Sequence, residues 1–233
     1  ENGLEGHIEF KNVWFAYNEG EWILKDVSFE VKPGEFVAFV GATGAGKSTI
    51  MHLLCRFYDI DKGEILIDGV PIRDYCLADL RRSIGVVQQN IFLYSGSIVD
   101  NITLNRESVS PEDARRAAKL VNAEEFIYKL PHGFDEEITE RGSTLSSGQR
   151  QLLSFARTVA AKPSLLVLDE ATANIDTETE ILIQEAIGKM AQGRSMIAVA
   201  HRISTIADAD RIIVMHNGQR SEEHTSELQS PNL

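Results

Sequence analysis

A glycine-rich segment between a strand pattern and a helix pattern constrains this 233-residue chain more than any other feature. The segment reads Gly41-Ala-Thr-Gly-Ala-Gly-Lys-Ser48. It follows the apolar run Phe36–Val40, predicted to be a buried strand, and precedes Thr49–Arg56, predicted to be a helix. Its glycines allow a tight turn with inward N–H groups, and the helix N-terminus adds partial positive charge. This order of strand, loop and helix predicts a cradle for phosphate groups.

Within the cradle, two side chains are expected to have separate tasks. Lys47 should reach the β- and γ-phosphates of a nucleoside triphosphate, and Ser48 should offer its hydroxyl to Mg²⁺. The residues expected to contact the nucleotide are Gly41, Ala42, Thr43, Gly44, Ala45, Gly46, Lys47, Ser48 and Thr49. The alternative is a glycine-rich turn that binds nothing, which the complete strand-to-helix spacing disfavours.

Two carboxylates end a second apolar run, Ser164–Glu170, which reads Ser-Leu-Leu-Val-Leu-Asp-Glu. Ligands of open α/β sheets bind at the carboxyl ends of the strands, so both side chains should lie near the cradle. We expect Asp169 to hold the Mg²⁺ shell and Glu170 to polarise the water that attacks the γ-phosphate. A solvated acidic turn is the alternative. The presence of both the carboxylates and the glycine loop favours an ATPase instead.

A third segment, Leu145-Ser-Ser-Gly-Gln149, gives the chain a resemblance to the nucleotide-binding domain of ATP-binding cassette (ABC) transporters, over about residues 7 to 219. It is similar to that family's signature motif, usually Leu-Ser-Gly-Gly-Gln. Ser147 replaces the first glycine, a departure expected to weaken the contact with ATP. The resemblance implies that Ser146, Ser147, Gly148 and Gln149 contact ATP held by a second such domain. The residues alone predict a helix cap before a helix over Arg150–Ala160.

Further positions match the family individually. The resemblance implies that Tyr17 stacks on adenine, although strands favour aromatic residues and core packing is the alternative. Gln89 matches the glutamine that reaches Mg²⁺ and the attacking water, with Gln88 as the adjacent rival. His201, after the apolar run Met196–Ala200, matches the histidine that contacts the γ-phosphate.

Two more segments carry the resemblance toward partner domains. Asp176, in Ala-Asn-Ile-Asp, matches the nucleotide-contacting aspartate of a loop that usually reads Ser-Ala-Leu-Asp. Thr139-Glu-Arg-Gly142 is similar to an element of the exporter branch that touches coupling helices of the membrane domain. The Ser-Ser-Gly signature and the Ala-Asn-Ile-Asp loop together resemble one half of a heterodimeric multidrug exporter.

The predicted fold class is α/β: a P-loop NTPase core with a mostly parallel sheet, an N-terminal antiparallel β subdomain and an inserted helical subdomain. Alternation in His7–Tyr17 and Val27–Val31 predicts half-buried strands, and Gly63–Gly69 predicts a strand ending in an Asp-Gly turn. Strands are expected to stop from Asn90 to Leu145, and a helix is expected over Pro111–Val121.

The organisation expected from these patterns is one ABC ATPase domain over residues 1–219, with the helical subdomain at about 90–160. Residues 220–233 are expected to be a non-native tail, because Arg220–Ser230 resembles the conceptual translation of a common sequencing adapter. A natural polar tail is the alternative. The tail has no apolar periodicity and is expected to be disordered or arbitrarily placed. The start at Glu1 without methionine suggests a fragment or an excised domain.

Composition agrees with a catalytic module. The chain is 43% hydrophobic, which supplies a sizeable core, and its net charge of −12 disfavours nucleic acid and anionic membrane surfaces as partners. No run approaches the roughly eighteen apolar residues that span a bilayer. The resemblance implies a location on the cytoplasmic face of the plasma (inner) membrane, as part of a transporter.

The function predicted from all these patterns is hydrolysis of ATP, with Mg²⁺, to power export through a transmembrane domain fused upstream. Lys47, Gln89, Glu170 and His201 are the expected catalytic residues, and Ser48, Gln89 and Asp169 the expected Mg²⁺ ligands. The second nucleotide-binding domain could be identical or different. The alternatives are an importer ATPase, a soluble ABC protein of translation or DNA repair, and a regulatory half that holds ATP without hydrolysing it. Glu170 argues against the last.

Overall fold

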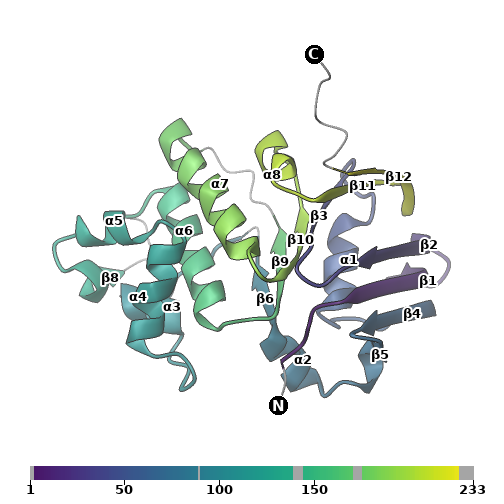
Figure 1. The fold of residues 1–233 in the computed structure, drawn as a ribbon, viewed down its shortest axis with the longest axis horizontal. Coiled ribbons are helices and arrows are strands. Elements are labelled where there is room, and N and C mark those ends of the chain that lie inside the picture. Colours follow the sequence, from purple (N-terminus) through teal and green to yellow (C-terminus); the bar gives the residue numbers. More distant parts are fainter. Residues whose placement is uncertain (1–2, 89, 139–143, 170–174, 226–233) are drawn as a thin grey trace. The chain divides into compact units, whose positions relative to one another are not determined.

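The computed structural model describes residues 3–88, 90–138, 144–169 and 175–225, in two compact units (Figure 1). The sheet unit contains Glu1–Ile84, Ser164–Glu170 and Gly193–Leu233, and the helical unit contains Gly85–Pro163 and Ala171–Gln192. The fold is the predicted α/β type, a P-loop NTPase core with an antiparallel sheet and a helical part.

The first sheet of the sheet unit is antiparallel, in the order β2-β1-β4-β5. Its strands are β1 (Ile8–Ala16), β2 (Trp22–Val31), β4 (Lys62–Ile67) and β5 (Val70–Pro71). Ile8 is paired with Val31 on one side and Ile67 on the other, so three buried aliphatic side chains line up across the sheet. The predicted Asp-Gly turn joins β4 to β5, and both Asp68 and Gly69 have positive φ, as this hairpin type requires.

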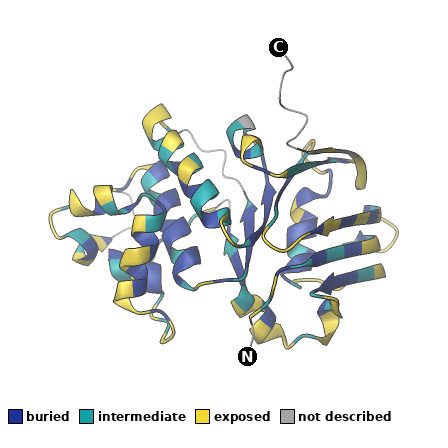
Figure 2. Ribbon diagram, viewed as in Figure 1, coloured by how far each residue is buried: buried dark blue, intermediate teal, exposed yellow. Residues whose placement is uncertain are grey.

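The second sheet has the order β12-β11-β3-β10-β9 within this unit. Its strands are β3 (Phe36–Val40), β9 (Leu165–Asp169), β10 (Ser195–Val199), β11 (Arg211–His216) and β12 (Gln219–Thr225). All are parallel except β12. Strands β3, β9 and β10 are buried almost throughout (Figure 2), as their unbroken apolar runs predict.

The carboxyl ends of these central strands lie at the same end of the parallel strands. Val199, the last residue of β10, is paired with Asp169 of β9 and with Phe39 of β3. The residues after β3 and β10 therefore begin beside the end of β9. This register places the glycine-rich loop, Asp169 and the segment that contains His201 at the carboxyl ends of the parallel strands.

Disorder, one of the two outcomes predicted for the tail, is wrong for residues 220–225, which form most of β12. This strand is antiparallel to β11, with Ile212 opposite His224 and Ile213 opposite Glu223. Pairing at a sheet edge uses main-chain groups, so it needs no apolar periodicity in the added strand. Residues 226–233 lie outside the described residues, and the origin of the tail stays a hypothesis.

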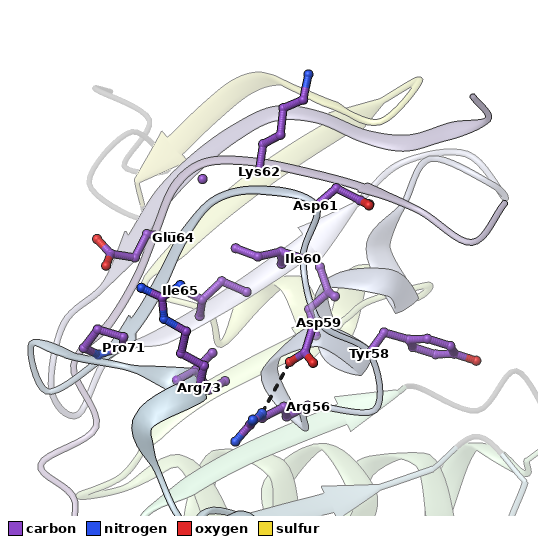
Figure 3. A pocket seen from close by; sticks show the side chains of 13 residues that line it. Arg56, Tyr58, Asp59, Ile60, Asp61, Lys62, Glu64, Ile65, Pro71 and Arg73 are labelled. Carbon is purple, nitrogen blue, oxygen red and sulfur yellow. Dashed lines mark hydrogen bonds and ion pairs between the residues drawn. The ribbon is translucent and has the colours of Figure 1, made fainter. Parts of the chain in front are cut away.

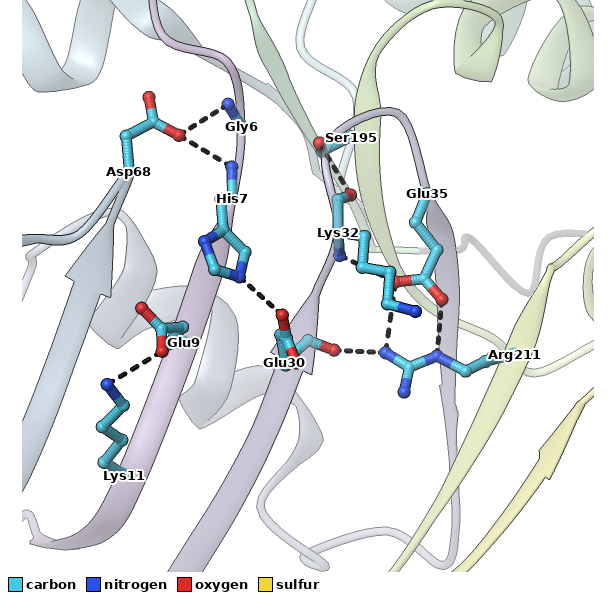
Figure 4. Close-up of polar contacts among 10 residues, drawn as sticks. All are labelled: Gly6, His7, Glu9, Lys11, Glu30, Lys32, Glu35, Asp68, Ser195 and Arg211. Atoms are coloured by element: carbon cyan, nitrogen blue, oxygen red, sulfur yellow. Dashed lines mark hydrogen bonds and ion pairs between the residues drawn. The ribbon is translucent and has the colours of Figure 1, made fainter.

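A polar network ties the two sheets of this unit together (Figure 4). Arg211, at the start of β11, donates to both carboxylate oxygens of Glu35 at 2.6 and 3.2 Å, and also to the carbonyl of Glu30 in β2. Within the first sheet, Asp68 accepts hydrogen bonds from the amides of Gly6 and His7 at 2.9 and 2.8 Å. The paired arginine contact is charge-assisted and fixes the end of β2 against β11.

The helices of the sheet unit are short. They are α1 (Lys47–Leu54), the 3₁₀ helix η1 (Ile72–Asp74), α2 (Leu77–Ser83) and α8 (Ile203–Ala207). Helix α1 buries Ile50, Leu53 and Leu54. Six of its eight residues are buried, Lys47 and Thr49 among them, so the phosphate-loop helix is packed on most of its sides. Strand β6 (Ile84–Val87) follows α2 and continues into the helical unit.

The helical unit has two features that differ from expectation. Its elements are β7 (Gly96–Ser97), α3 (Ile98–Thr103), α4 (Pro111–Leu120), α5 (Glu124–Tyr128), η2 (Gly133–Asp135), β8 (Glu137–Ile138), α6 (Ser147–Ala160) and α7 (Thr177–Ala191). Strands were expected to be absent here, yet β7 and β8 form a two-residue antiparallel pair. Helix α6 begins three residues before the predicted Arg150, because the signature serines already belong to its first turn and cap.

Helices α3 and α4 begin at the sequence features that predict helix starts. Ser97 and Asp100 form a reciprocal capping box at α3, and Ser110 and Asp113 form another at α4, which also starts with Pro111. No helix among the residues that the structure describes is long and apolar enough to cross a membrane.

Candidate functional site

The glycine-rich loop connects β3 to α1, and its three glycines all have positive φ. Gly46 is the residue before α1 and has a φ of 98°, a left-handed conformation that side chains disfavour. A Cβ atom on Gly41 would lie 2.2 Å from the carbonyl oxygen of Met215. The loop therefore approaches β11 closely before it turns into the helix. The first N–H groups of α1, which have no acceptor within the helix, point out of this turn.

Lys47 lies at the centre of the cradle. Its side chain is 5% exposed, and Nζ donates hydrogen bonds to the carbonyls of Gly41 at 2.7 Å and Ala42 at 2.9 Å. Burial lowers the pKa of Lys47, and the nearby charge of Asp169 opposes that shift. Ser48 is exposed and Thr49 buried, so the two neighbouring hydroxyls lie in different environments. A cradle with a buried ammonium and an exposed hydroxyl has the donors that phosphate and Mg²⁺ need.

Asp169 ends β9 beside this cradle and has basic side chains around it. Burial raises the pKa of Asp169, whereas His201, His52 and Lys47 each lower it by their charge. His201 is exposed and follows the end of β10. The structure thus brings together three residues predicted from separate parts of the sequence: Lys47, Asp169 and His201. Electrostatic coupling between groups on three different elements is typical of a functional site.

A turn that the sequence reasoning missed supports the cradle from outside. Gly218, between β11 and β12, donates its N–H to the carbonyl of Ala45 at 3.2 Å, and its carbonyl accepts from the amide of Lys25 at 2.8 Å. A Cβ on Gly218 would lie 2.1 Å from the carbonyl oxygen of Ile23. The dipeptide Asn217-Gly218 is a turn signal in the sequence, but nothing local predicts what the turn contacts.

Tyr17 follows β1 and is neither fully buried nor isolated. Its side chain is 42% exposed, and its hydroxyl lies 3.2 Å from Thr49 Oγ1 and 3.0 Å from His52 Nδ1. The ring meets Phe15 and Tyr58 nearly at right angles, with centroids 4.8 and 5.0 Å away. The core-packing alternative is therefore wrong for Tyr17. His52 escaped the sequence prediction because it belongs to no motif, although it lies one turn after Thr49 on α1.

The signature residues form the N-terminus of α6 in the helical unit. Ser146 caps the helix: its Oγ accepts from the amide of Gln149 at 3.1 Å, and Gln149 Oε1 accepts from the amide of Ser146 at 3.0 Å. The helix-cap prediction is confirmed. Ser147 and Gly148 are the first two helical residues, so their N–H groups lie in the first turn, where anions bind.

Gly148 is buried against the start of α7. A Cβ at Gly148 would lie 2.1 Å from Thr179 Cγ2 and 3.3 Å from Ile175 Cγ2. Asp176 caps α7 by accepting from the amide of Thr179 at 2.9 Å, and this bond lowers the pKa of Asp176. Thr179 thus connects two predicted nucleotide-contacting segments within one chain. Sequence reasoning missed it because the contact joins residues distant in sequence.

Several predicted residues have no structural description. Gln89 and Glu170 lie outside the described residues, as do Thr139–Gly142 and the loop positions Ala173 and Asn174. Gln88, the rival of Gln89, is exposed and follows β6. The assignment between the two glutamines stays open.

A cavity of about 560 Å³ in the sheet unit contains none of the predicted ligands (Figure 3). Arg56 turns toward Asp59 at 3.4 Å in its wall. The residues that line it are Leu53, Arg56, Tyr58, Asp59, Ile60, Asp61, Lys62, Gly63, Glu64, Ile65, Pro71, Ile72 and Arg73. Its wall carries three basic and three acidic side chains, so it offers no single charge to a ligand, and we place the functional site at the cradle.

The donors at the cradle fit a nucleotide with Mg²⁺ in kind. Lys47 and the amides of the first turn suit phosphate, and Ser48 with Asp169 offers oxygen ligands, which Mg²⁺ prefers together with phosphate oxygens and water. Among the residues that the structure describes, no group of three or more His, Cys, Asp or Glu side chains could hold a metal by itself.

The chain is similar to known proteins along almost its whole length. A family model described as "ABC transporter" matches residues 24–173, more than half of the chain. The chain is 52% identical over 223 residues to exp8 of Streptococcus pneumoniae, named provisionally as an ABC transporter ATP-binding protein. It is 50% identical over 222 residues to YheH of Bacillus subtilis, named provisionally as a multidrug resistance ABC transporter ATP-binding/permease protein.

These matches cover 96% and 95% of this chain but only 38% of exp8 and 33% of YheH. The chain thus spans less than two fifths of the length of these relatives. The solved structure of a bacterial Atm1-family ABC exporter with ATP bound is similar in fold, with a TM-score of 0.88 and 41% identity. That match covers 97% of this chain and 40% of the solved one.

Proposed function

The chain belongs to the ABC transporter family, and from this premise we propose that it hydrolyses ATP to power an exporter. Family membership confirms the expected class, an ABC-type ATP-binding domain. The exporter branch is part of the proposal, and the names of YheH and of the solved Atm1-family exporter support it. The observation that carries the proposal is that Lys47, Asp169 and His201 lie close together at the carboxyl ends of the parallel strands. We further propose that residues 1–219 form one ATPase domain.

In the proposed mechanism the chain mainly positions groups and neutralises charge, since phosphoryl transfer asks little covalent chemistry of a protein. Lys47 exchanges its two loop carbonyls for phosphate oxygens, and the first-turn amides of α1 bind the same phosphates. Thr49 and the loop residues complete this grip, while Tyr17 stacks on the adenine.

Three side chains would hold Mg²⁺: Ser48, Asp169 and Gln89. The metal, when bound, would neutralise charge on the phosphates. Glu170 follows Asp169 and would accept the proton of the attacking water, and His201 would donate to the γ-phosphate. Burial around Asp169 suits a Mg²⁺ ligand, because a partly desolvated carboxylate gains most from a nearby cation.

We propose two partners. The first is a second nucleotide-binding domain, identical or different, whose ATP would meet Ser146, Ser147, Gly148, Gln149 and Asp176 of this chain. The capped N-terminus of α6 supports this, because its first-turn amides form an anion site. The second is a transmembrane domain, since YheH is named as an ATP-binding/permease protein. The complete transporter would lie in the plasma membrane, with this domain on the cytoplasmic face.

The experiment that tests hydrolysis compares ATP turnover by the purified chain with that of Glu170→Gln. Glutamine keeps the shape of glutamate but removes the basic carboxylate, so Mg-ATP should still bind while turnover falls by about 10²-fold or more, the usual contribution of a general base. Glu107→Gln, an exposed change in the helical unit, is the matched control and should turn over ATP normally.

Turnover by Glu170→Gln close to that of the parent would overturn the assignment of Glu170. A parent chain that binds Mg-ATP but does not hydrolyse it, even at high concentration, would indicate the regulatory half instead. A parent chain that binds no nucleotide would overturn the proposed function as a whole.

A further inference from the structure

One helix carries groups that face both ends of the proposed nucleotide. Lys47, Ser48 and Thr49 form the first turn of α1, and His52 lies three residues after Thr49 on the same face. The hydroxyl of Tyr17 lies between Thr49 Oγ1 at 3.2 Å and His52 Nδ1 at 3.0 Å. The aromatic residue proposed for the base is therefore fastened to the helix proposed for the phosphates.

The ring of Tyr17 has neighbours that leave part of it open. Phe15, 3% exposed, packs against it from β1, and Tyr58 meets it from the loop after α1. The ring of His52 is itself packed near Tyr58 and Phe57, with centroids 6.3 and 6.0 Å away. His52 thus has limited freedom, and its ring nitrogen is a fixed partner for the hydroxyl.

We propose that His52 is a positioning residue for base recognition, which rests on the proposed function of this site. By holding the hydroxyl of Tyr17 against α1, His52 fixes the aromatic ring in the place where the purine is to stack. A side chain that is already ordered loses less freedom when the ligand arrives, so affinity rises through preorganisation rather than through a new contact. His52 itself need not touch the nucleotide.

This arrangement predicts which ligands lose affinity when the hydrogen bond between Tyr17 and His52 is removed. The phosphate grip of Lys47 and the loop amides does not use the Tyr17–His52 hydrogen bond. Loss of that bond should weaken ligands that have a base more than it weakens a bare triphosphate, which is affected only through Thr49 and through the charge of His52 near Asp169. A purely structural role for His52 would instead weaken both, because the same helix carries both grips.

The experiment measures the affinity of Mg-ATP and of Mg-tripolyphosphate by calorimetry for the parent chain, His52→Phe, Tyr17→Phe and the double variant. His52→Phe keeps an aromatic ring but loses the hydrogen bond, and Tyr17→Phe keeps the stacking ring but loses the hydroxyl. Each should lower ATP affinity by about three- to tenfold, the range for one hydrogen bond. The double variant should be no weaker than Tyr17→Phe, because Tyr17→Phe already removes the hydroxyl that His52 binds. Affinity for Mg-tripolyphosphate should change less than affinity for Mg-ATP in every variant.

Three results would overturn the proposal: unchanged ATP affinity in His52→Phe, equal losses for both ligands, or additive losses in the double variant. If His52→Phe fails to fold, Tyr17→Phe and His52→Gln decide. Glutamine can still bond the hydroxyl, so it should keep ATP affinity within about twofold of the parent. A loss in His52→Gln as large as in Tyr17→Phe would contradict the proposal. A parent chain that binds neither ligand would refute the proposed function, a result distinct from all of these.

Discussion

At Gly148, packing within one chain leaves no room for a methyl group. The position where a Cβ would lie is 2.1 Å from Thr179 Cγ2, far inside van der Waals contact. We predict that Gly148→Ala lowers the free energy of unfolding by about 1–3 kcal/mol, the cost of overpacking a well-filled site. Because Thr179 belongs to the first turn of α7, the strain should spread to the cap formed by Asp176.

The matched control is Gly188→Ala, also in a helix. A Cβ at Gly188 would meet nothing within 4 Å, so alanine should stabilise α7 by about 0.4–1 kcal/mol. Urea unfolding of both variants measures the difference. If Thr179→Ala restores the stability of Gly148→Ala, the clash is confirmed. Equal stability of Gly148→Ala and the parent would show that this contact does not constrain the signature glycine.

At the scale of single residues, the sequence predicted the site better where the chemistry is local. Lys47 follows from its spacing within the loop, and Asp169 from its place at the end of an apolar run. His52, Thr179 and Gly218 could not be predicted, because each acts through a neighbour distant in sequence. A motif reports the residues that face a ligand, not the residues that hold those in place.

At the scale of elements, Asp113 fastens the start of α4 to the segment after α6. Its carboxylate accepts from the amide of Ser110 at 3.0 Å, from the side chain of Arg116 at 2.7 Å, and lies 2.8 Å from Lys162 Nζ. Lys162, then Ser110 and Arg116, hold the pKa of Asp113 well below its usual range. The ionised carboxylate is therefore favoured in the folded chain.

We predict that Asp113→Asn is less stable than the parent at neutral pH, because asparagine cannot pair with Lys162 and Arg116. The pKa of Asp113 is depressed on folding, so its contribution is complete above the unfolded value of about 3.9 and is lost as pH falls below it. The stability gap between parent and variant should stay constant from pH 8 to about pH 5 and narrow below about pH 4.

The control is Glu125→Gln, which breaks an exposed ion pair with Lys129 on α5. Both side chains are more than 70% exposed, and such pairs contribute little. Urea midpoints measured across this pH range test the prediction. A gap for Asp113→Asn that grows as pH falls, or a neutral-pH gap no larger than that of Glu125→Gln, would contradict it.

The elements themselves show where sequence patterns succeed. Strand β3 matches its predicted residues, and α4 starts at the predicted residue and ends one residue early. Both were predicted well because an apolar run and a Ser-Pro helix start are local signals. Strands β7 and β8 are two residues each, too short to show a period of two. Strand β12 was missed because main-chain pairing to β11 needs no side-chain pattern.

At the scale of the whole molecule, we predict that the chain self-associates only with ATP. The signature helix and the cradle belong to different units of one chain, and the proposed site is completed by a second domain. In Glu170→Gln, Mg-ATP should move the population from monomer to dimer, since hydrolysis no longer removes the ligand. Two copies of a chain with a net charge of −12 repel each other. The association should therefore be measured at physiological salt, where the screening length is about 8 Å.

Sedimentation velocity with Mg-ATP, with Mg-ADP and without nucleotide measures this association. The ADP sample is the control and should remain monomeric, because ADP lacks the γ-phosphate that the signature helix would contact. A monomer mass in all three samples at high protein concentration would contradict a homodimer and would favour a different partner chain.

The central claim is that the cradle around Lys47 binds ATP, and calorimetric titration with Mg-ATP tests it most directly. The parent is compared with Lys47→Ala, and Lys129→Ala, an exposed change in the helical unit, is the control. Contacts of the Lys47 ammonium with phosphate should contribute about 1.5–3 kcal/mol each, so affinity should fall at least about tenfold in Lys47→Ala and stay unchanged in Lys129→Ala. Equal affinity of the parent and Lys47→Ala for Mg-ATP would contradict the account.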